Sequence, residues 1–481
     1  MKNRRLVLLL SLGIVLPLAS SPLLASCKEG GPEATTTGPG PDLVITNGKV
    51  LTVDKDFSIA EAVAVKGGKI VAVGTNSEVR KLIGENTKIL DLKGKTMLPG
   101  INDAHFHIQW FATNRPSPVL DLQMGPPPLP ATREQDKQAM INAMKELNAL
   151  GITSVTDPGQ DEAFTSIYND LYKEGKLTLR LSVLWCFSQR NVNDLKKIRE
   201  GLDSAGAPHV DNEWLRIVGL KIGADNIPND KTAWMRQDYV TGGNGKIYYP
   251  GQTDQERCQA MSDIIAYAHR LGFQVGIHVT GDRAIEACLD SFVKAESEDP
   301  KGLRHYIIHG DFTPIEKEKI DLMVKYNIGV SAQPYLAMMV GPSMSLNIDP
   351  ERMARFAPLR SLIDGGVHVA GGSDGPIFYP DWKKGIQAAV LRETETGEVL
   401  GPDQRITVPE AIRMYTIEGA WQDHMEHLKG SIEVGKLADF CVLDKDILSV
   451  EPHHIKDIQT LMTIVGGKIV YNARPKDFKP Q

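Results

Sequence analysis

The sequence predicts an α/β fold, a (β/α)8 TIM barrel with a small β-sandwich built from its N- and C-terminal segments. Eight short apolar runs alternate with amphipathic stretches such as 253–271, a pattern typical of parallel strands joined by helical crossovers. The expected barrel region is about 330 residues long, within the size range of such a fold. They lie at 97–104, 152–156, 180–187, 215–222, 274–279, 305–309, 328–333 and 367–373. A doubly wound open sheet is the alternative, but no GxGxxG motif follows any run.

Short strands with glycine turns occur at both ends of this region. The N-terminal part contains β-branched runs around the hairpin signal Gly67-Gly68, and the C-terminal part has the same texture around Gly466-Gly467. Neither part is long enough to be stable alone, so we expect the two to pair in one sandwich. The expected boundaries are 42–98 and 431–475 for the sandwich and 99–430 for the barrel.

The first residues have the pattern of an export signal. Basic residues precede an apolar run from Leu6 to about Leu18, which is too short to favour a stable membrane span. Leu24-Ala25-Ser26-Cys27 then resembles a bacterial lipobox, which predicts a lipoprotein signal peptide over 1–27 with lipidation of Cys27. Residues 28–41 are rich in Gly, Pro and Thr and are expected to form a flexible linker. We therefore expect an exported lipoprotein, anchored to the membrane through lipid alone, on the periplasmic or extracytoplasmic face.

Two alternatives to this export model stay open. An ordinary signal peptide could be cut near Cys27, leaving that cysteine incidental. Residues 3–8 also resemble a weak twin-arginine signal, which would export the protein after folding rather than by the general route.

The composition narrows the classes of partner. Net charge is −6 with a pI near 6.1, so no basic surface for nucleic acid is expected. Hydrophobic residues make up 42% of the chain, which fits a globular protein with a substantial core. A small-molecule substrate is the expected partner, and a homo-oligomer is compatible with the sequence.

The strongest local signal for chemistry is the segment 98–107, LPGINDAHFH. His105 and His107 are two residues apart at the end of the first predicted barrel strand, so both imidazoles point to the same face. On an inward-facing strand they can share one metal ion. The pair alone is a weak signal, and its alternative is a pair of polar core residues, but its place at this strand end makes it specific.

Other polar side chains follow later runs at the same end. These are Lys221, His278, His309 and Asp374. Because the carboxyl ends of barrel strands form the active-site face, we expect them to converge with His105 and His107. The alternatives are structural roles, with Lys221 as a salt-bridging lysine and Asp374 as a turn acid.

Five motifs along the chain point to one family. They are LPGINDAHFH (98–107), HVTGDRAIEA (278–287), SAQP (331–334), GGSDGP (371–376) and KGSIEVGKLADFCVLD (429–444). Together they resemble the amidohydrolase superfamily, and within it the branch that includes N-substituted formamide deformylases. The similarity covers about residues 42–475, and the last motif identifies only the superfamily.

The resemblance implies a role for each of these residues. His105, His107, His278 and His309 correspond to metal ligands, and Asp374 to a ligand that also serves as general base. Lys221 corresponds to a lysine that can be N6-carboxylated to bridge two metals. Gln333, within SAQP, is implied as a substrate contact. The implied activity is hydrolysis of a non-peptide C–N bond, amide or formamide-like, with one or two divalent metals.

The chemistry of the residues agrees with this implication. Imidazole and carboxylate ligands suit Zn²⁺, with Fe or Mn as alternatives. A metal lowers the pKa of bound water from 15.7 toward about 7. Asp374 can accept that proton and pass it to the leaving nitrogen. An ammonium group has no lone pair, so Lys221 binds metal only if carboxylated or deprotonated.

Two further features bear on the substrate. Asp282 and Arg283 directly follow the fifth strand and are candidates to orient it, the alternative being a helix-start acid and a surface arginine. Residues 223–250 interrupt the alternation with aromatic residues among glycines and charges. We expect either a substrate lid at the barrel mouth or a passive surface insertion.

Two departures from the family pattern leave other functions open. Ile308 stands where a Glu usually precedes the strand-six histidine, and Asn226 follows Asp225 where Gly is usual. One alternative is an exported ligand- or metal-binding lipoprotein with a decayed site. Another is an ester, lactone or phosphoester hydrolase on the same fold, since the same hydroxide attacks all of these bonds.

Overall fold

The computed structural model describes residues 40–113, 132–188, 193–208 and 211–480. The predicted signal peptide, Cys27 and almost all of the predicted linker lie outside these ranges and stay predictions. Across the part of the chain that is described, no helix is both long enough and apolar enough to cross a bilayer.

Eight parallel strands, β8 to β15, form the central sheet, and each hydrogen-bonds to the next in chain order. Every predicted apolar run overlaps one of them, which confirms the barrel. The strands are β8 (Ile101–Asp103), β9 (Ile152–Gln160), β10 (Arg180–Trp185), β11 (Leu215–Gly223), β12 (Gln274–His278), β13 (Tyr306–Ile308), β14 (Gly329–Ala332) and β15 (Val369–Gly371). Each of these strands carries at least one buried Leu, Ile or Val side chain, as expected where helices cover a parallel sheet.

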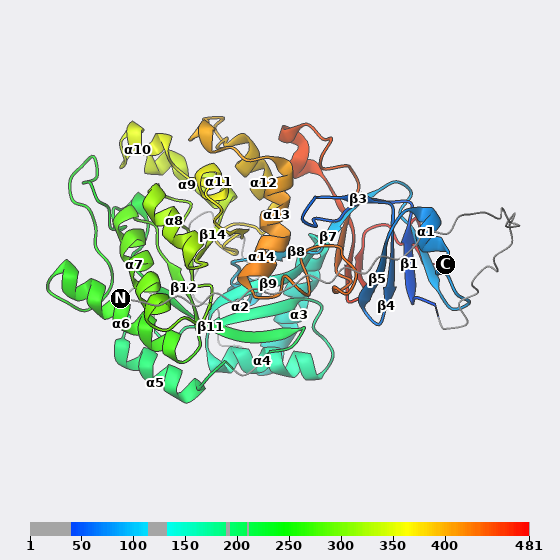
Figure 1. Cartoon of the computed structure of the whole chain (residues 1–481), viewed down its shortest axis with the longest axis horizontal. Helices are drawn as coiled ribbons and strands as arrows, with labels where there is room; N and C mark the ends of the chain where they lie inside the picture. The colour runs from blue at the N-terminus through cyan, green and yellow to red at the C-terminus, as the bar shows by residue number, and fades with distance from the viewer. Residues whose placement is uncertain (1–39, 114–131, 189–192, 209–210, 481) are drawn as a thin grey trace, which may run out of the picture. The chain divides into compact units, whose positions relative to one another are not determined.

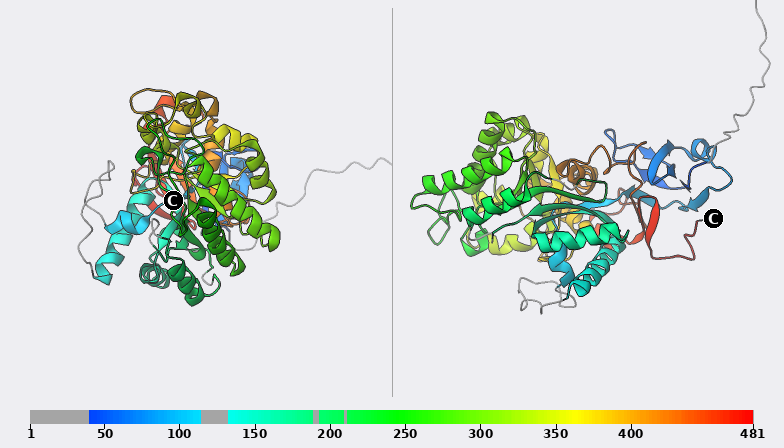
Figure 2. Two further views of the ribbon diagram at one scale, coloured as in Figure 1. Left: turned by 90° about the vertical axis from the view of Figure 1, so that its left-hand side faces the viewer. Right: turned by 90° about the horizontal axis from the view of Figure 1, so that it is seen from below.

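Helices connect the strands and lie outside them (Figures 1 and 2). Polar caps define where several begin: Thr253 and Glu256 form a capping box at the start of α6, as Thr407 and Glu410 do at α13. The helices are α2 (Ile108–Thr113), α3 (Arg133–Ala149), α4 (Glu162–Lys173), α5 (Leu195–Ala205), α6 (Asp254–Arg270), α7 (Asp282–Glu298), α8 (Lys317–Lys325), α9 (Pro334–Met344), α10 (Pro350–Ala354), α11 (Leu359–Asp364), α12 (Trp382–Leu391), α13 (Val408–Arg413) and α14 (Gly419–Gln422).

Two further sheets form the predicted sandwich. One has the strand order β5-β4-β1-β6, and the other has the order β18-β17-β16-β7-β2-β3 and so joins the two ends of the chain. In Figure 1 the red C-terminal strands accordingly lie beside the blue N-terminal ones. The elements are β1 (Leu43–Thr46), β2 (Lys49–Leu51), β3 (Ile59–Ala60), β4 (Ala62–Lys66), β5 (Lys69–Gly74), α1 (Asn76–Arg80), β6 (Lys88–Asp91), β7 (Thr96–Pro99), β16 (Phe440–Leu443), β17 (Thr460–Val465) and β18 (Lys468–Asn472).

The predicted run 97–104 is two strands rather than one. It breaks at Gly100, whose amide donates to the Asp439 carbonyl, so that β7 belongs to the sandwich and β8 to the barrel. A Cβ at Gly100 would lie 2.1 Å from Thr153 Oγ1, so only glycine allows this close passage. The bend therefore delivers the chain from the sandwich directly into the first barrel strand.

The closing motif 429–444 holds the sandwich to the amino end of the barrel. Asp439 makes two hydrogen bonds, of 2.6 and 2.9 Å, with the buried guanidinium of Arg180 at the start of β10. Lys429 forms a buried ion pair of 2.8 Å with Asp423, which also accepts a hydrogen bond from Asn102 of β8. The motif therefore has a structural role at the end of the barrel opposite to the strand ends that carry the candidate ligands.

The insertion 223–250 packs against the segment that follows β12. Its side chains Trp234, Tyr239 and Tyr249 are all buried. Asp225 receives three backbone hydrogen bonds, from Trp234 within the segment and from Thr280 and Gly281 after β12. The aromatic residues thus stabilise the segment itself, and its role as a substrate lid stays a prediction.

Candidate metal centre

The carboxyl ends of the barrel strands carry the predicted ligands. His105 and His107 follow β8, His278 is the last residue of β12, and His309 follows β13. Asp374 lies three residues after β15. Because all eight strands are parallel, these positions lie at the same end of the barrel.

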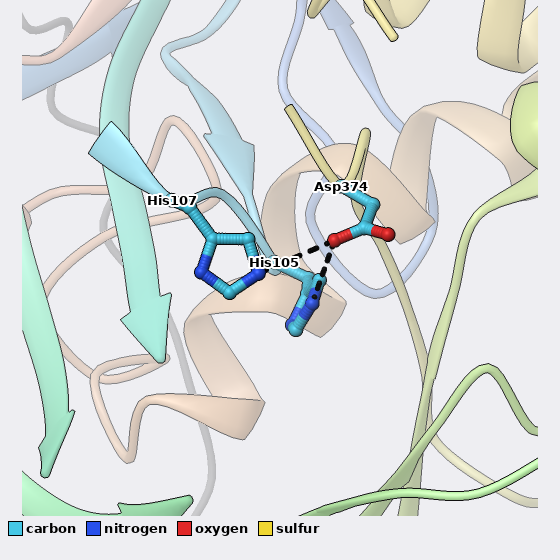
Figure 3. A group of neighbouring side chains, drawn as sticks. All are labelled: His105, His107 and Asp374. Carbon is cyan, nitrogen blue, oxygen red and sulfur yellow. Dashed lines mark ion pairs between the residues drawn. The ribbon is translucent and has the colours of Figure 1, made fainter. Parts of the chain in front are cut away.

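Three imidazoles meet around the Asp374 carboxylate, and Figure 3 shows two of them, those of His105 and His107. His105 Nε2 lies 3.0 Å from Asp374 Oδ1, and His107 Nε2 lies 3.4 Å from the same oxygen. His309 Nε2 lies 3.9 Å from Asp374 Oδ2. The Nε2 atoms of three imidazoles therefore point toward a single acid.

The fourth histidine, His278, lies next to His309. The ring centroids of His278 and His309 are 4.6 Å apart, and those of His105 and His309 are 5.4 Å apart. The structure thus brings together the four histidines and the aspartate that the sequence singled out, from positions spread over 270 residues of chain.

Lys221 lies on β11 and is buried. It pairs in the sheet with Gly276, two residues before His278. Its positive charge also contributes to the lowered pKa of His105. Its carboxylation stays a prediction.

The protonation states of the group suit metal binding. Burial, followed by the positive charge of Lys221, holds the pKa of His105 well below its usual value. Burial alone would raise the pKa of Asp374, but the imidazoles of His105, His107 and His309 around it outweigh that effect and leave the pKa well below normal. A neutral imidazole and an ionised carboxylate are the forms that bind a cation.

The donor set fits a divalent metal. The ligand atoms of His105, His107 and Asp374 lie within 4.8 Å of one another, and two more imidazoles adjoin them. Histidine nitrogen with carboxylate oxygen is a set typical of zinc enzymes. His309 and Asp374 also hold positive φ angles of 65° and 56°, a strained conformation for residues other than glycine that often marks functional sites.

A second cluster of possible ligands, His269, Glu296 and His305, is buried at the amino end of the barrel. His269 Nδ1 and His305 Nε2 are 2.8 Å apart, a hydrogen-bonding distance. Two nitrogens on one tetrahedral zinc would be about 3.3 Å apart. Glu296 accepts the backbone amides of 301, 302 and 303. This cluster is therefore a hydrogen-bond network within the core.

The three predicted substrate-binding residues lie in different settings. Gln333 is buried directly after β14, and its amide nitrogen donates to Ser331. Asp282 accepts the backbone amide of Arg236 in the insertion, and Arg283 lies over the ring of Trp234. Arg283 also pairs with Asp254 of α6 at 3.8 Å, so the described contacts of these two residues are with the insertion and with α6 and α7. All three substrate-binding roles stay predictions.

Neither departure from the family pattern removes a ligand from the group. Ile308 is buried in a small apolar cluster with Leu184 and Tyr306. At Asn226 the backbone carbonyl, which any residue would supply, lies 3.4 Å from His278 Nε2.

Sequence reasoning missed two buried acids beside the site. Asp103 and Asp225 bind backbone amides around the ligand-bearing segments, as hydrogen-bond acceptors rather than as ligands. Asp103 stands in the DxHxH motif and Asp225 precedes Asn226, and the place of each acid at or just past the end of a strand could have indicated it.

A parallel barrel with histidines and an aspartate at its carboxyl rim defines the class of metal-dependent barrel hydrolases. A family model described as "Amidohydrolase family" matches residues 112–471. The chain belongs to the amidohydrolase family and is a hydrolase.

Sequence similarity to several named proteins over most of the chain supports this assignment. The N-substituted formamide deformylase of Arthrobacter pascens is 25% identical over 549 aligned positions, which cover 89% of this chain and 98% of that protein. The 5-methylthioadenosine/S-adenosylhomocysteine deaminase of Natronomonas pharaonis is 23% identical, with 90% and 93% covered. Among solved structures, an uncharacterized metal-dependent hydrolase from Pyrococcus horikoshii superposes with a TM-score of 0.71 at 19% identity, covering 86% of this chain and 99% of that one. The last likeness concerns the fold alone.

Proposed function

We propose that this protein hydrolyses a non-peptide C–N bond of a small amide or formamide, with a divalent metal as cofactor and Asp374 as general base. The observation that carries the proposal is the convergence of three imidazole Nε2 atoms on the Asp374 carboxylate. The full-length similarity to a deformylase supports the choice of a formamide-like substrate.

Zn²⁺ is the proposed metal, with Fe or Mn as alternatives, held by His105, His107, His278, His309 and Asp374. Such an ion supplies a lowered pKa for a bound water and polarises a carbonyl group. A carboxylated Lys221 would add ligand oxygens and allow two ions instead of one.

Asp374 is suited to move a proton. Its carboxylate is ionised because His105, His107 and His309 surround it, so it can accept a proton from water. It can then donate that proton to the leaving nitrogen, which departs as a neutral amine. Gln333, Asp282 and Arg283 are the proposed substrate contacts.

An Asp374→Asn variant of the full chain tests the mechanism. Loss of the base should lower kcat against a panel of formamides and amides by about 10²- to 10⁴-fold. Plasma mass spectrometry should find about one or two metals per chain in the wild type, as expected for such a site. A metal-replete variant with full activity would refute the role of Asp374.

The same panel, extended with esters, lactones and phosphoesters, separates the competing functions. A decayed binding protein would show no turnover of any substrate, and an esterase would hydrolyse esters or lactones in preference to amides. Robust amide turnover that is lost in His105→Ala would exclude the decayed site.

We also propose export and a lipid anchor on Cys27, on the strength of the LASC segment and the apolar run before it. Metabolic labelling with a fatty acid should mark the wild type and not Cys27→Ala. Labelling of both proteins would contradict the proposal.

A further inference from the structure

The seam of the barrel runs through the candidate metal centre. The strand order ends with β8 on one side and β15 on the other, and the segments that follow them close the gap. Ala104 N donates to the Gly371 carbonyl at 3.0 Å, Asp374 N to the His105 carbonyl at 2.9 Å, and His107 N to the Gly375 carbonyl at 2.8 Å. The residues that close the barrel are therefore the candidate ligands and their neighbours.

One buried carboxylate oxygen spans this seam. Asp103 Oδ1 accepts the backbone amide of Ser373 at 2.9 Å and that of His105 at 3.2 Å. Its side chain is almost fully buried, and no lysine or arginine among the described residues forms an ion pair with it. The carboxylate therefore acts on backbone amides, one on each side of the seam.

The backbone that follows β15 is packed tightly against the segment that follows β8. A Cβ at Gly372 would lie 2.8 Å from His105 N and 3.2 Å from Asp103 Oδ1, so the two segments touch through glycine. Asp374 follows with a φ of 56°, a conformation that persists only where neighbouring contacts impose it. The bond from Ser373 N to Asp103 is one of these contacts.

We infer that Asp103 is a positioning residue that holds His105 and Asp374 at their mutual distance across the barrel seam, and so sets the affinity of the site for its metal. The inference rests on the proposed function, because it concerns the metal of that same site. It assigns Asp103 no contact with the substrate or the metal.

Two substitutions distinguish positioning from other roles. Asp103→Ala removes the acceptor and should weaken Zn²⁺ binding by about 10- to 100-fold, the usual effect of losing a group that orients metal ligands. Asp103→Asn keeps an oxygen at the same place and should bind Zn²⁺ nearly as tightly as the wild type. If the asparagine variant loses as much affinity as the alanine variant, Asp103 acts through its charge and the inference fails.

The matched control is Asn102→Ala. Asn102 is the preceding residue on β8 and is also buried. Its side chain donates a hydrogen bond to Asp423 and not to the segment that follows β15. This variant should lose stability without losing metal affinity. Equal losses of affinity in Asn102→Ala and Asp103→Ala would indicate general loosening and would overturn the inference.

The experiment uses the full chain, stripped of metal and titrated with Zn²⁺ against a chromophoric chelator. Absorption spectra of the Co²⁺-loaded proteins report ligand geometry directly, and we expect a changed spectrum only for Asp103→Ala. If that variant does not fold, hydrogen exchange of the wild type decides: rapid exchange of the Ser373 and His105 amides would contradict the bonds to Asp103.

The outcomes separate this inference from the proposed function. A wild type that binds neither Zn²⁺ nor Co²⁺ would overturn the proposed function and the inference together. A wild type that binds both, with an Asp103→Ala variant of equal affinity and identical Co²⁺ spectrum, would overturn the inference alone.

Discussion

His305 and His309 show how two imidazoles four residues apart in one chain take opposite roles. His305 lies at the amino end of β13, where its Nδ1 accepts the Val275 amide at 2.9 Å and its Nε2 faces His269. His309 lies past the other end, among the candidate ligands. Strand length predicted this separation, because each residue of a strand advances the chain by about 3.3 Å.

The stability of the protein should fall in acid partly because of His305. Burial, and then the charge of His269, lowers the pKa of His305 to about 3, while the unfolded chain has the ordinary value of 6.5. The unfolded state therefore binds a proton first. The His305 contribution is complete above pH 6.5 and is lost as pH falls toward 3, by about 1 kcal/mol per pH unit.

Urea unfolding of wild type and His305→Gln between pH 7 and 4 checks this expectation. The glutamine cannot titrate, so its free energy of unfolding should depend less steeply on pH than that of the wild type, with the difference growing toward acid. Parallel curves for the two proteins would show that His305 does not contribute.

At the scale of elements, strand ends and insertions are held in place by buried acids. Asp225 binds the backbone amides of Trp234, Thr280 and Gly281, so it joins the insertion to the turn between β12 and α7. A Cβ at Gly281 would lie 2.2 Å from the Trp234 carbonyl, which shows how closely the two segments pack. The pattern of the sequence predicted the insertion but not this attachment.

Asp225→Ala should release the insertion. Removal of the carboxylate leaves three buried amides without this acceptor, at a cost of about 1 to 3 kcal/mol each. Hydrogen exchange should then accelerate at Trp234, Thr280 and Gly281. Asp230→Ala, which alters an exposed acid in the same segment, is the control and should leave these amides unchanged. Unaltered protection in Asp225→Ala would show that other contacts hold the segment.

At the scale of the whole molecule, the barrel and the sandwich share buried charges as well as a continuous chain. Arg180 of β10 pairs with Asp439 just before β16, and its guanidinium lies 4.5 Å from the centre of the Trp214 ring. Both members of the pair are almost fully buried. Loss of either one would leave the other as an uncompensated charge in the interior.

Asp439→Asn should therefore destabilise the protein strongly. Breaking one side of a buried ion pair costs about 3 to 5 kcal/mol, measurable by urea unfolding. The comparison is Glu200→Ala, which removes the exposed partner of Lys196 and should change stability by less than about 1 kcal/mol. Similar losses of stability in both variants would mean that the buried Arg180–Asp439 pair stabilises the protein no more than an exposed pair does.

The fold class and the cluster of candidate ligands could be predicted from the sequence because both depend on local pattern. Alternation of apolar runs and helical stretches defines a parallel barrel, and a polar residue after each run must lie at the carboxyl rim. His105, His107, His278, His309 and Asp374 all follow from this rule. The expected boundary at 98/99 placed the change of domain inside the run 97–104, but its division into two strands at Gly100 did not follow, because only the pairing partners of the two halves distinguish them.

The chain by itself thus determined which side chains face the barrel mouth. Only the tertiary structure decided how they are held: that Asp103 spans the seam, that Asp225 fastens the insertion and that Arg180 meets Asp439. The physical reason is that strand direction and side-chain alternation are set within a few residues. A hydrogen bond between residues 270 positions apart depends instead on the register of every strand between them.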